Sequence, residues 1–340
     1  MNVRPVEIIG GGLAGLSLGI ALRRHKVPVT LHEAGRYPRH RVCGEFITGL
    51  APATLVRLGL ESALADALHH REVAWFSRDR PPQIHRLPAP ALGLSRHTLD
   101  ARLATSFTAN GGELILDSRV AAKAEKPGVI WATGRRRATV SKWIGLKIHA
   151  RDLALTRELE MHLGASCYVG LARIEDGAVN ICGLFRRRPL AGPGPELLLA
   201  YLRAAGLDAL AQRCAAARIE PESFCAVAAL GFDRQMPRTT RVSLGDASAM
   251  IPPFTGNGMA MAFQSAEIAL APLLAYARGE ISWEKARREI QRALRSRFLL
   301  RLASAGALHP FLLQPHRQRW LAALSRARLL PFRPLYATLH

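Results

Sequence analysis

The sequence predicts an α/β fold: a Rossmann-like parallel sheet is interleaved with a mostly antiparallel sheet and followed by C-terminal helices. Three features carry this prediction: a strand-helix-strand start at residues 6–33, a hairpin pattern over 167–185, and a basic helical tail. A chain of 340 residues is long enough for two domains that share a core.

The first element is the βαβ unit "VEIIGGGLAGLSLGIALRRHKVPVTLHE". Gly10, Gly12 and Gly15 fit the spacing G-x-G-x-x-G between an apolar strand and a helix, and Glu33 ends the second strand. Glycines let the backbone approach a pyrophosphate, the helix N-terminus adds partial positive charge, and the acid accepts a ribose hydroxyl. The predicted dinucleotide-binding residues here also include Leu13, Ala14 and Ala34.

The later elements follow from alternating patterns. A helix and a strand are predicted in "LSRHTLDARLATSFTANGGELILD", and another strand in "GVIWATG". The stretch "CYVGLARIEDGAVNICGLF" predicts a β-hairpin that turns at Glu175–Gly177. Residues 195–217 are expected to be helical, and "VSLGDASAM" to be a strand that leads into a helix.

The domains are expected to be woven together, because nucleotide-binding pieces alternate with strand-rich pieces. The predicted cofactor-binding domain comprises residues 1–70, 94–147 and 236–280, and the substrate domain 71–93 and 148–235. A basic helical segment, 281–340, completes the chain.

Composition limits the partners and the compartment. The net charge is +21, but 41 of the 47 basic residues are arginine and no nucleic-acid-binding motif accompanies them, so no nucleic-acid partner is predicted. The five cysteines form no CxxC pair and the histidines show no metal-ligand spacing. We therefore expect a cytoplasmic protein without disulfides or a metal site. No run of eighteen uncharged apolar residues predicts a membrane span.

A second glycine-rich helix start, "GDASAMIPPFTGNGMAMA", lies more than two hundred residues after the first. NAD is held largely by one βαβ unit, whereas FAD has a ribityl chain and a flavin that need their own anchor. Asp246 is expected to accept hydrogen bonds from ribityl hydroxyls, and Gly256 and Gly258 to let amides approach the flavin. The predicted contacts at this end also include Gly245, Pro253, Asn257 and Met259.

Three separated motifs resemble the flavoprotein superfamily of para-hydroxybenzoate hydroxylase-type monooxygenases, geranylgeranyl reductases and flavin-dependent halogenases. They are the N-terminal glycine motif, "LSRHTLDARL" and "GDASAMIPPFTGNGMAMA". The resemblance implies non-covalent FAD, with Arg96 near the cofactor and Asp246 as the family aspartate. Thr133–Gly134 stands where the hydroxylases carry Asp-Gly, so hydroxylase-type use of NADPH is not expected.

Within the superfamily, "YPRHRVCGEF" resembles the P-x-x-C-G segment of the geranylgeranyl reductase branch. This implies that Cys43 and Gly44 lie near the flavin face, and that the hairpin forms a wall of the substrate cavity. That branch usually has a tryptophan and Phe-Pro in the hairpin, where this chain has Gly170 and Ala172–Arg173. A geranylgeranyl substrate therefore does not follow from the resemblance.

Two residues are the predicted catalytic candidates. Cys43 follows Arg39, His40 and Arg41, whose charges would favour a thiolate; the alternatives are a proton donor or a small buried residue. Glu45 is expected to be either a general acid or a surface carboxylate paired with an arginine.

Two arginines are predicted to contact FAD phosphate or ribose, Arg41 and Arg96, because the guanidinium group binds phosphate through several donors. The stretch 117–130 is shorter than the family β-meander that it replaces, which predicts a more open flavin site.

These features together predict an FAD-dependent oxidoreductase, a reductase or dehydrogenase that transfers hydride through flavin N5 and acts on a lipophilic small molecule. NAD(P)H is a candidate electron donor. The alternatives are a monooxygenase of the same fold and a flavoprotein scaffold without turnover. The C-terminal helices are expected either to pack on the flavin domain or to contact an anionic membrane through their arginines.

Overall fold

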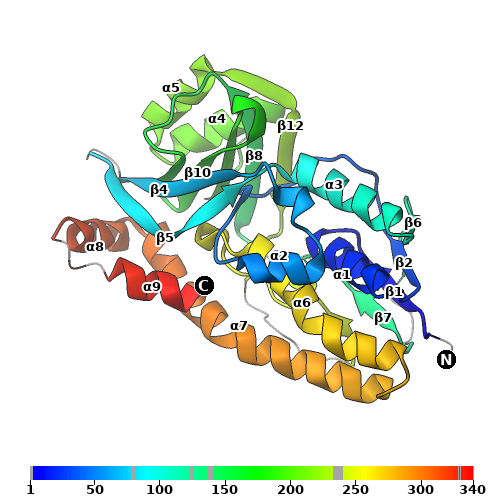
Figure 1. Cartoon of the computed structure of the whole chain (residues 1–340). Coiled ribbons are helices and arrows are strands. Elements are labelled where there is room, and N and C mark those ends of the chain that lie inside the picture. The colour runs from blue at the N-terminus through cyan, green and yellow to red at the C-terminus, as the bar shows by residue number, and fades with distance from the viewer. Residues whose placement is uncertain are drawn as a thin grey trace.

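A computed structural model describes residues 3–77, 81–121, 126–135, 141–190, 192–232, 240–327, 329 and 331–339. It contains two sheets and a C-terminal set of helices (Figure 1). This arrangement confirms the predicted fold class. The predicted Thr133–Gly134 lies within the described residues, whereas part of the shortened 117–130 stretch, residues 122–125, lies outside them.

Sheet A is the parallel sheet, with strand order β13-β7-β1-β2-β6. Its central strand is flanked by parallel partners on both sides. The strands are β1 (Val6–Ile9), β2 (Val29–His32), β6 (Glu113–Ile115), β7 (Val129–Trp131) and β13 (Val242–Ser243). Because all are parallel, the carboxyl ends of the strands lie along one edge of the sheet, where α/β proteins bind their ligands.

Three helices cover sheet A: α1 (Leu13–Arg24), α3 (Arg96–Ala109) and α6 (Gly258–Ala277). Helix α1 packs against both others, and ten of its twelve residues are buried. Gly19 allows this packing, because a Cβ there would collide with the ring of Phe107 on α3. Helix α6 is long and apolar enough to cross a membrane, but more than half of its residues are buried in this core.

Sheet B has eight strands in the order β12-β8-β11-β10-β9-β4-β5-β3. The predicted hairpin lies in the middle of this sheet. Its strands β10 and β11 pair antiparallel, from the pair Cys167 and Phe185 to the pair Arg173 and Val179. The strands are β3 (Phe46–Ile47), β4 (Leu68–Ser77), β5 (Gln83–Gly93), β8 (Trp143–Arg151), β9 (Leu159–Gly164), β10 (Cys167–Arg173), β11 (Val179–Arg186) and β12 (Arg218–Ala228).

The two faces of sheet B have different surroundings. Helices α4 (Gly194–Ala204) and α5 (Asp208–Ala216) cover one face and bury side chains such as Ile148 and Ile181. Figure 1 shows these helices on the side of the sheet away from α7 and α8. The predicted helix over 195–217 is thus two helices, because Gly206 adopts a positive φ of 72° between them.

The C-terminal segment forms α7 (Trp283–Leu313), α8 (Pro315–Arg326) and α9 (Phe332–Leu339). Helix α7 packs along α6 through Ile290, Leu294 and Phe298, and its last turns reach β9 and β10. Helix α2 (Pro52–Leu58) contacts α6 from another side. Two segments that the sequence assigned to the cofactor-binding pieces belong to sheet B instead. Residues 46–47 form β3, and residues 143–147 are the first part of β8.

Candidate active site

The predicted phosphate loop joins β1 to α1 at the carboxyl edge of sheet A. Gly10 has a φ of 112°, and a Cβ there would collide with the carbonyl of Ala132 at the end of β7. Gly15 lies against the Gly10 carbonyl, so it too has no room for a side chain. Gly12 differs, because a Cβ there would meet nothing within 4 Å. The N-terminus of α1, which has no side-chain cap, therefore opens onto free space.

Glu33 is buried beside this loop, as the spacing predicts. Its carboxylate accepts hydrogen bonds from Gly11 N at 2.7 Å and Gly35 N at 3.1 Å, and pairs with Arg39 at 2.6 Å. The hydroxyl of Tyr37 donates to the Gly11 carbonyl. A carboxylate has about four acceptor positions. Glu33 therefore stabilises the loop and keeps one position for a ligand hydroxyl.

Two of the predicted arginines converge on one buried acid. Arg96 forms two hydrogen bonds with Asp100, at 2.7 and 2.9 Å, and Arg41 forms one at 2.8 Å. Burial opposes the charge of Arg96, but Asp100 outweighs it and raises the pKa of Arg96. Burial and the neighbouring Arg96 lower the pKa of Arg41. Nη2 of Arg41 is buried without a hydrogen-bond partner, which leaves a charged donor for an anionic ligand.

The second glycine-rich segment also ends in an open helix start. Gly256 has a φ of 68°, and a Cβ there would collide with the ring of Phe46. Gly258, the first residue of α6, has nothing within 4 Å of a built Cβ. The side chain of Asn257 is not directed at this space, because its amide donates to the carbonyl of Leu339 at 2.7 Å. Only the backbone of Asn257 is available to a cofactor.

Asp246 follows β13 at the same edge of sheet A. The residue is exposed, but burial of its carboxyl by the surrounding protein raises its pKa to about 6, against the opposing charges of Arg96 and Arg135. Gly245 packs against Ala14 of α1 through its backbone, with a φ of 58°. The ends of β1, β2, β7 and β13 thus gather the predicted residues of three distant segments.

The remaining predicted residues are divided between the core and the surface. Leu13, Ala14 and Met259 are buried, so their side chains belong to the core. Ala34, Thr133 and Pro253 are exposed at the edge of sheet A or in the loop before α6.

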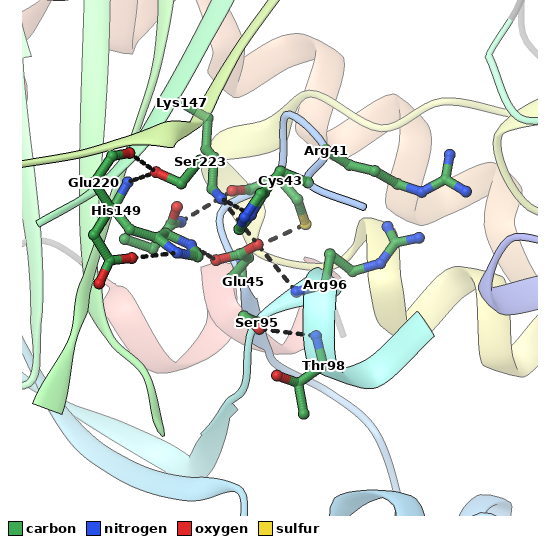
Figure 2. Close-up of polar contacts among 12 residues, drawn as sticks. Arg41, Cys43, Glu45, Ser95, Arg96, Thr98, Lys147, His149, Glu220 and Ser223 are labelled. Carbon is green, nitrogen blue, oxygen red and sulfur yellow. Dashed lines mark hydrogen bonds and ion pairs between the residues drawn. The ribbon is translucent and has the colours of Figure 1, made fainter. Parts of the chain in front are cut away.

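A buried cluster of charged side chains lies where the segment after β2 meets sheet B, shown in Figure 2. The carboxylate of Glu45 accepts a hydrogen bond from the backbone N of Arg96 at 3.0 Å. Its oxygens also lie 2.6 Å from Nε2 of His149 and 3.6 Å from Nζ of Lys147. Glu45 and Lys147 are fully buried. The expectation of a surface carboxylate paired with an arginine side chain is therefore wrong, because strand β8 supplies the partners of Glu45.

Further polar side chains complete this cluster. His40 Nδ1 lies 3.1 Å from Nζ of Lys147, and burial, followed by the charge of Lys147, lowers the pKa of His40 to about 4. Asn180 donates to the carbonyl of Cys43 at 2.9 Å. Oδ1 of Asn180 is buried without a partner. Sequence reasoning missed Lys147, His149 and Asn180, although alternation in "WIGLKIHAR" places Lys147 and His149 on one face of a strand.

Cys43 lies at the edge of the cluster, and its sulfur accepts a hydrogen bond from Glu45 N at 3.5 Å. Burial raises the pKa of the Cys43 thiol, although Arg96 acts in the opposite direction. The expectation of a thiolate is therefore wrong. Arg39 and Arg41 are directed away, toward Glu33 and Asp100. A neutral thiol suits a proton donor better than a nucleophile.

An apolar cavity adjoins the loop before α6. It contains about 950 Å³ of space free of atoms, including solvent space at its open mouth, and its lining is almost entirely apolar. Phe46 and Phe254 line it on the side of the glycine-rich loop, and Gly170 and Met161 line it on sheet B. Helices α7, α8 and α9 close the rest. The hairpin strand β10 thus forms one wall of this cavity.

Gly170 is paired with Cys182 of β11, which is paired in turn with Lys147 of β8. Met161 of β9 is the partner of Gly170 on its other side. These residues form one row on the same face of sheet B. The charged cluster and the apolar cavity are therefore neighbours on one continuous surface.

No family model matches the chain. A curated protein, the menaquinone reductase of Mycolicibacterium smegmatis, is 30% identical over 125 residues. The match covers 35% of this chain and 31% of that protein, so it spans about a third of the relative.

Solved structures resemble the chain over most of its length. Pseudomonas aeruginosa PqsL, solved in complex with 2-aminobenzoylacetate, has a TM-score of 0.73 at 15% identity, covering 92% of this chain and 97% of that one. A geranylgeranyl bacteriochlorophyll reductase-like protein of Thermoplasma acidophilum has a TM-score of 0.71 at 15% identity, covering 92% and 88%. The myxobacterial FAD-dependent halogenase CndH has a TM-score of 0.70 at 16% identity, covering 90% and 83%. The chain therefore has the fold of these proteins.

Proposed function

We propose that the chain is an FAD-dependent oxidoreductase of the reductase or dehydrogenase class, acting on a lipophilic small molecule. One observation carries the proposal: a glycine that faces open space lies at the start of both α1 and α6, Gly12 and Gly258, and an apolar cavity adjoins the second of them. A dinucleotide with a pyrophosphate and a ring system needs two such helix starts. The fold shared with FAD-dependent proteins supports this reading.

The residues present fit FAD. The N-terminus of α1 at Gly12 would hold the pyrophosphate, and the remaining acceptor position of Glu33 would hold a ribose hydroxyl. Arg41 would use its unpartnered Nη2 on the anionic part of the cofactor. Asp246 would accept from the ribityl chain, and the N-terminus of α6 would face the pyrimidine edge of the flavin. Bound FAD supplies hydride transfer at N5.

The substrate site is assigned to the apolar cavity, because an almost wholly apolar lining binds a lipophilic chain and rejects a charged one. Because burial raises the pKa of the Cys43 thiol, this thiol is protonated at neutral pH, and we assign it the role of proton donor to the substrate. Glu45 is fully buried, so we assign it a positioning role: it fixes the segment carrying Cys43 to α3 and β8. The partial similarity to a menaquinone reductase agrees with a reductase and a lipophilic substrate.

A monooxygenase is the second candidate, because PqsL, described as a probable FAD-dependent monooxygenase, has the same fold. Rapid mixing of the reduced protein with oxygen separates the two. The reductase proposal predicts fast reoxidation without a long-lived oxygen adduct. An adduct that persists and decays faster with substrate would assign the chain to the monooxygenases.

The first test is the visible spectrum of the purified protein before and after denaturation. We expect flavin bands and release of about one FAD per chain on denaturation, because no covalent link is proposed. Reduction by NADH and by NADPH is then followed without oxygen to identify the donor. A colourless protein that binds no added FAD would refute the proposal.

A further inference from the structure

Exposed large apolar side chains concentrate in the C-terminal segment, on α7, on α8 and just after α8. Ten large apolar residues of the described part are exposed, and six of them lie between 299 and 329. These six, which we call the tail face, are Leu299, Leu300, Phe311, Trp320, Leu324 and Leu329. Trp320 is 70% exposed. A cluster of this kind on a protein surface marks an interaction site.

The C-terminal segment that carries the tail face has charges of one sign. No Asp or Glu follows Glu289, whereas nine arginines do. Arg319 and Arg326 are exposed on α8, the helix that carries Trp320 and Leu324. The guanidinium of Arg317 lies over the ring of Phe311, 5.2 Å from its centroid, so an arginine charge stands directly beside one of the exposed apolar side chains. Exposed apolar side chains on the same helices as these arginines are complementary to an anionic bilayer.

The tail face is continuous with the apolar cavity. Phe311 lines the cavity and is also 38% exposed, so it lies at the rim. Leu321, the neighbour of Trp320, lines the cavity from α8, and Leu335 lines it from α9. The helices that present arginines and apolar side chains to the outside are therefore the walls of the cavity.

We propose that the tail face docks on an anionic lipid bilayer and that a lipophilic substrate passes from the bilayer, past Phe311, into the cavity. Docking goes beyond the proposed oxidoreductase function, and only the identity of the cargo rests on that function. Trp320 and Leu324 enter the interfacial region of the bilayer, and Arg319 and Arg326 contact lipid phosphates.

Sedimentation of the full-length protein with vesicles tests this proposal. One set contains phosphatidylglycerol and phosphatidylcholine, and the other phosphatidylcholine alone. We expect binding to the anionic vesicles at low salt, release at high salt, and little binding to the neutral ones. No binding to anionic vesicles at low salt would overturn the proposal.

Two double variants locate the contact. Arg319→Glu with Arg326→Glu should lower the vesicle partition coefficient at least about tenfold through charge, and Trp320→Ser with Leu324→Ser about tenfold through lost apolar contact. The control for the charge change is Arg203→Glu, at an exposed position of α4, on the side of sheet B away from α7 and α8 (Figure 1). The control for the apolar change is Val56→Ser, at an exposed position of α2. Both controls should bind like the parent. Equal binding by the double variants and their controls would overturn the assignment to the tail face.

Two further measurements separate this proposal from others. The flavin spectrum of each variant is recorded, so that loss of FAD and loss of vesicle binding are distinguished. Gel filtration tests the competing occupant, a second copy of the chain. A dimer that Trp320→Ser with Leu324→Ser dissociates, together with no vesicle binding, would assign the tail face to self-association and refute docking.

Discussion

Oε2 of Glu45 lies 2.6 Å from Nε2 of His149, although 104 residues separate them in the chain. The other oxygen of Glu45 accepts from the backbone of Arg96, at the start of α3. One buried carboxylate thus connects the Cys43 segment, a helix that packs on sheet A, and a strand of sheet B. The position of Cys43 relative to the carboxyl edge of sheet A depends on this connection.

Glu45→Gln should destabilise the protein by about 3 kcal/mol, because fully buried Lys147 would lose its counter-charge. Urea denaturation measures the change. Adding Lys147→Met should recover part of the loss, since no charge would then be left unpaired. Glu61→Gln, at an exposed position, is the control and should be neutral. Unchanged stability of Glu45→Gln would show that Lys147 does not depend on this carboxylate.

His309 on α7 should make stability fall below pH 6.5. It is buried among Tyr168, Phe254 and Phe232, and this burial lowers its pKa to about 4. Between pH 6.5, the ordinary pKa of histidine, and about pH 4, the pKa of His309 in the folded protein, the unfolded chain binds a proton that the folded protein does not. The free energy of unfolding therefore decreases as pH falls through this range. A shift of this size corresponds to roughly 3 kcal/mol over the window.

His309→Phe removes this titration and keeps an aromatic ring. We expect the slope of unfolding free energy against pH, between pH 6.5 and 4, to decrease by about one proton. His25→Phe, at an exposed site, should leave the slope nearly unchanged. The same slope in His309→Phe and the parent would mean that His309 is protonated in the folded protein.

Much of the fold could be predicted because its signals are local. The strand, the glycines, the helix and Glu33 follow one another within residues 6–33, and the hairpin is encoded by alternation on either side of its turn. The buried cluster could not be predicted, because it depends on the register of the strands. Lys147 is paired with Cys182, and β12 shifts register between Glu220 and Cys225. Alternation identifies the face of a strand but not what packs on it.

The error about Cys43 has a similar cause. Basic neighbours in sequence suggested a thiolate, but side chains two and four positions before Cys43 are held by Asp100 and Glu33. Burial then decides the direction of the pKa shift. The charges that act on a thiol depend on where neighbouring side chains are directed, and distant acids determine this here.

Filling either open helix start should weaken cofactor binding without unfolding the protein. Gly258→Val and Gly12→Val each place a side chain where a built Cβ meets nothing within 4 Å. We expect the Kd for FAD to rise at least about tenfold, because the side chain occupies the space of the cofactor. Fluorescence quenching of added FAD measures Kd.

The matched control for these variants is Gly306→Ala on α7, where a built Cβ also meets nothing within 4 Å. This position lies on α7, outside both glycine-rich helix starts, so FAD affinity should not change, and stability should rise slightly through helix propensity. Normal FAD binding by both Gly258→Val and Gly12→Val would place the cofactor elsewhere.

The affinity for FAD should fall as pH decreases below about 6. Ionised Asp246 is the better acceptor for ribityl hydroxyls, and its pKa in the free protein is raised to about 6. Protonation therefore competes with binding, and bound FAD lowers the pKa of Asp246 in turn. In Asp246→Asn the affinity should be lower at pH 8 and flatter with pH. A parallel pH profile in the variant and the parent would exclude Asp246 as the responsible group.

Gly170 should set the length of the lipophilic chain that the cavity accepts. It lines the cavity, and the nearest atoms to a built Cβ are the carbonyl oxygens of Cys182 at 3.9 Å and Glu160 at 4.0 Å. A side chain at this position is therefore tolerated by the sheet and extends into the cavity. Gly170→Trp should leave FAD binding intact while it fills part of the roughly 950 Å³.

A series of n-alkyl naphthoquinones, from short to long chains, tests this through changes in the flavin spectrum on binding. In the parent, affinity should rise with each added methylene by about 0.8 kcal/mol until the chain fills the cavity. In Gly170→Trp the rise should stop at a shorter chain, whereas Ala226→Trp, at an exposed position of β12 outside the cavity lining, should match the parent. If Gly170→Trp follows the parent through the longest chain, the ligand does not occupy this cavity.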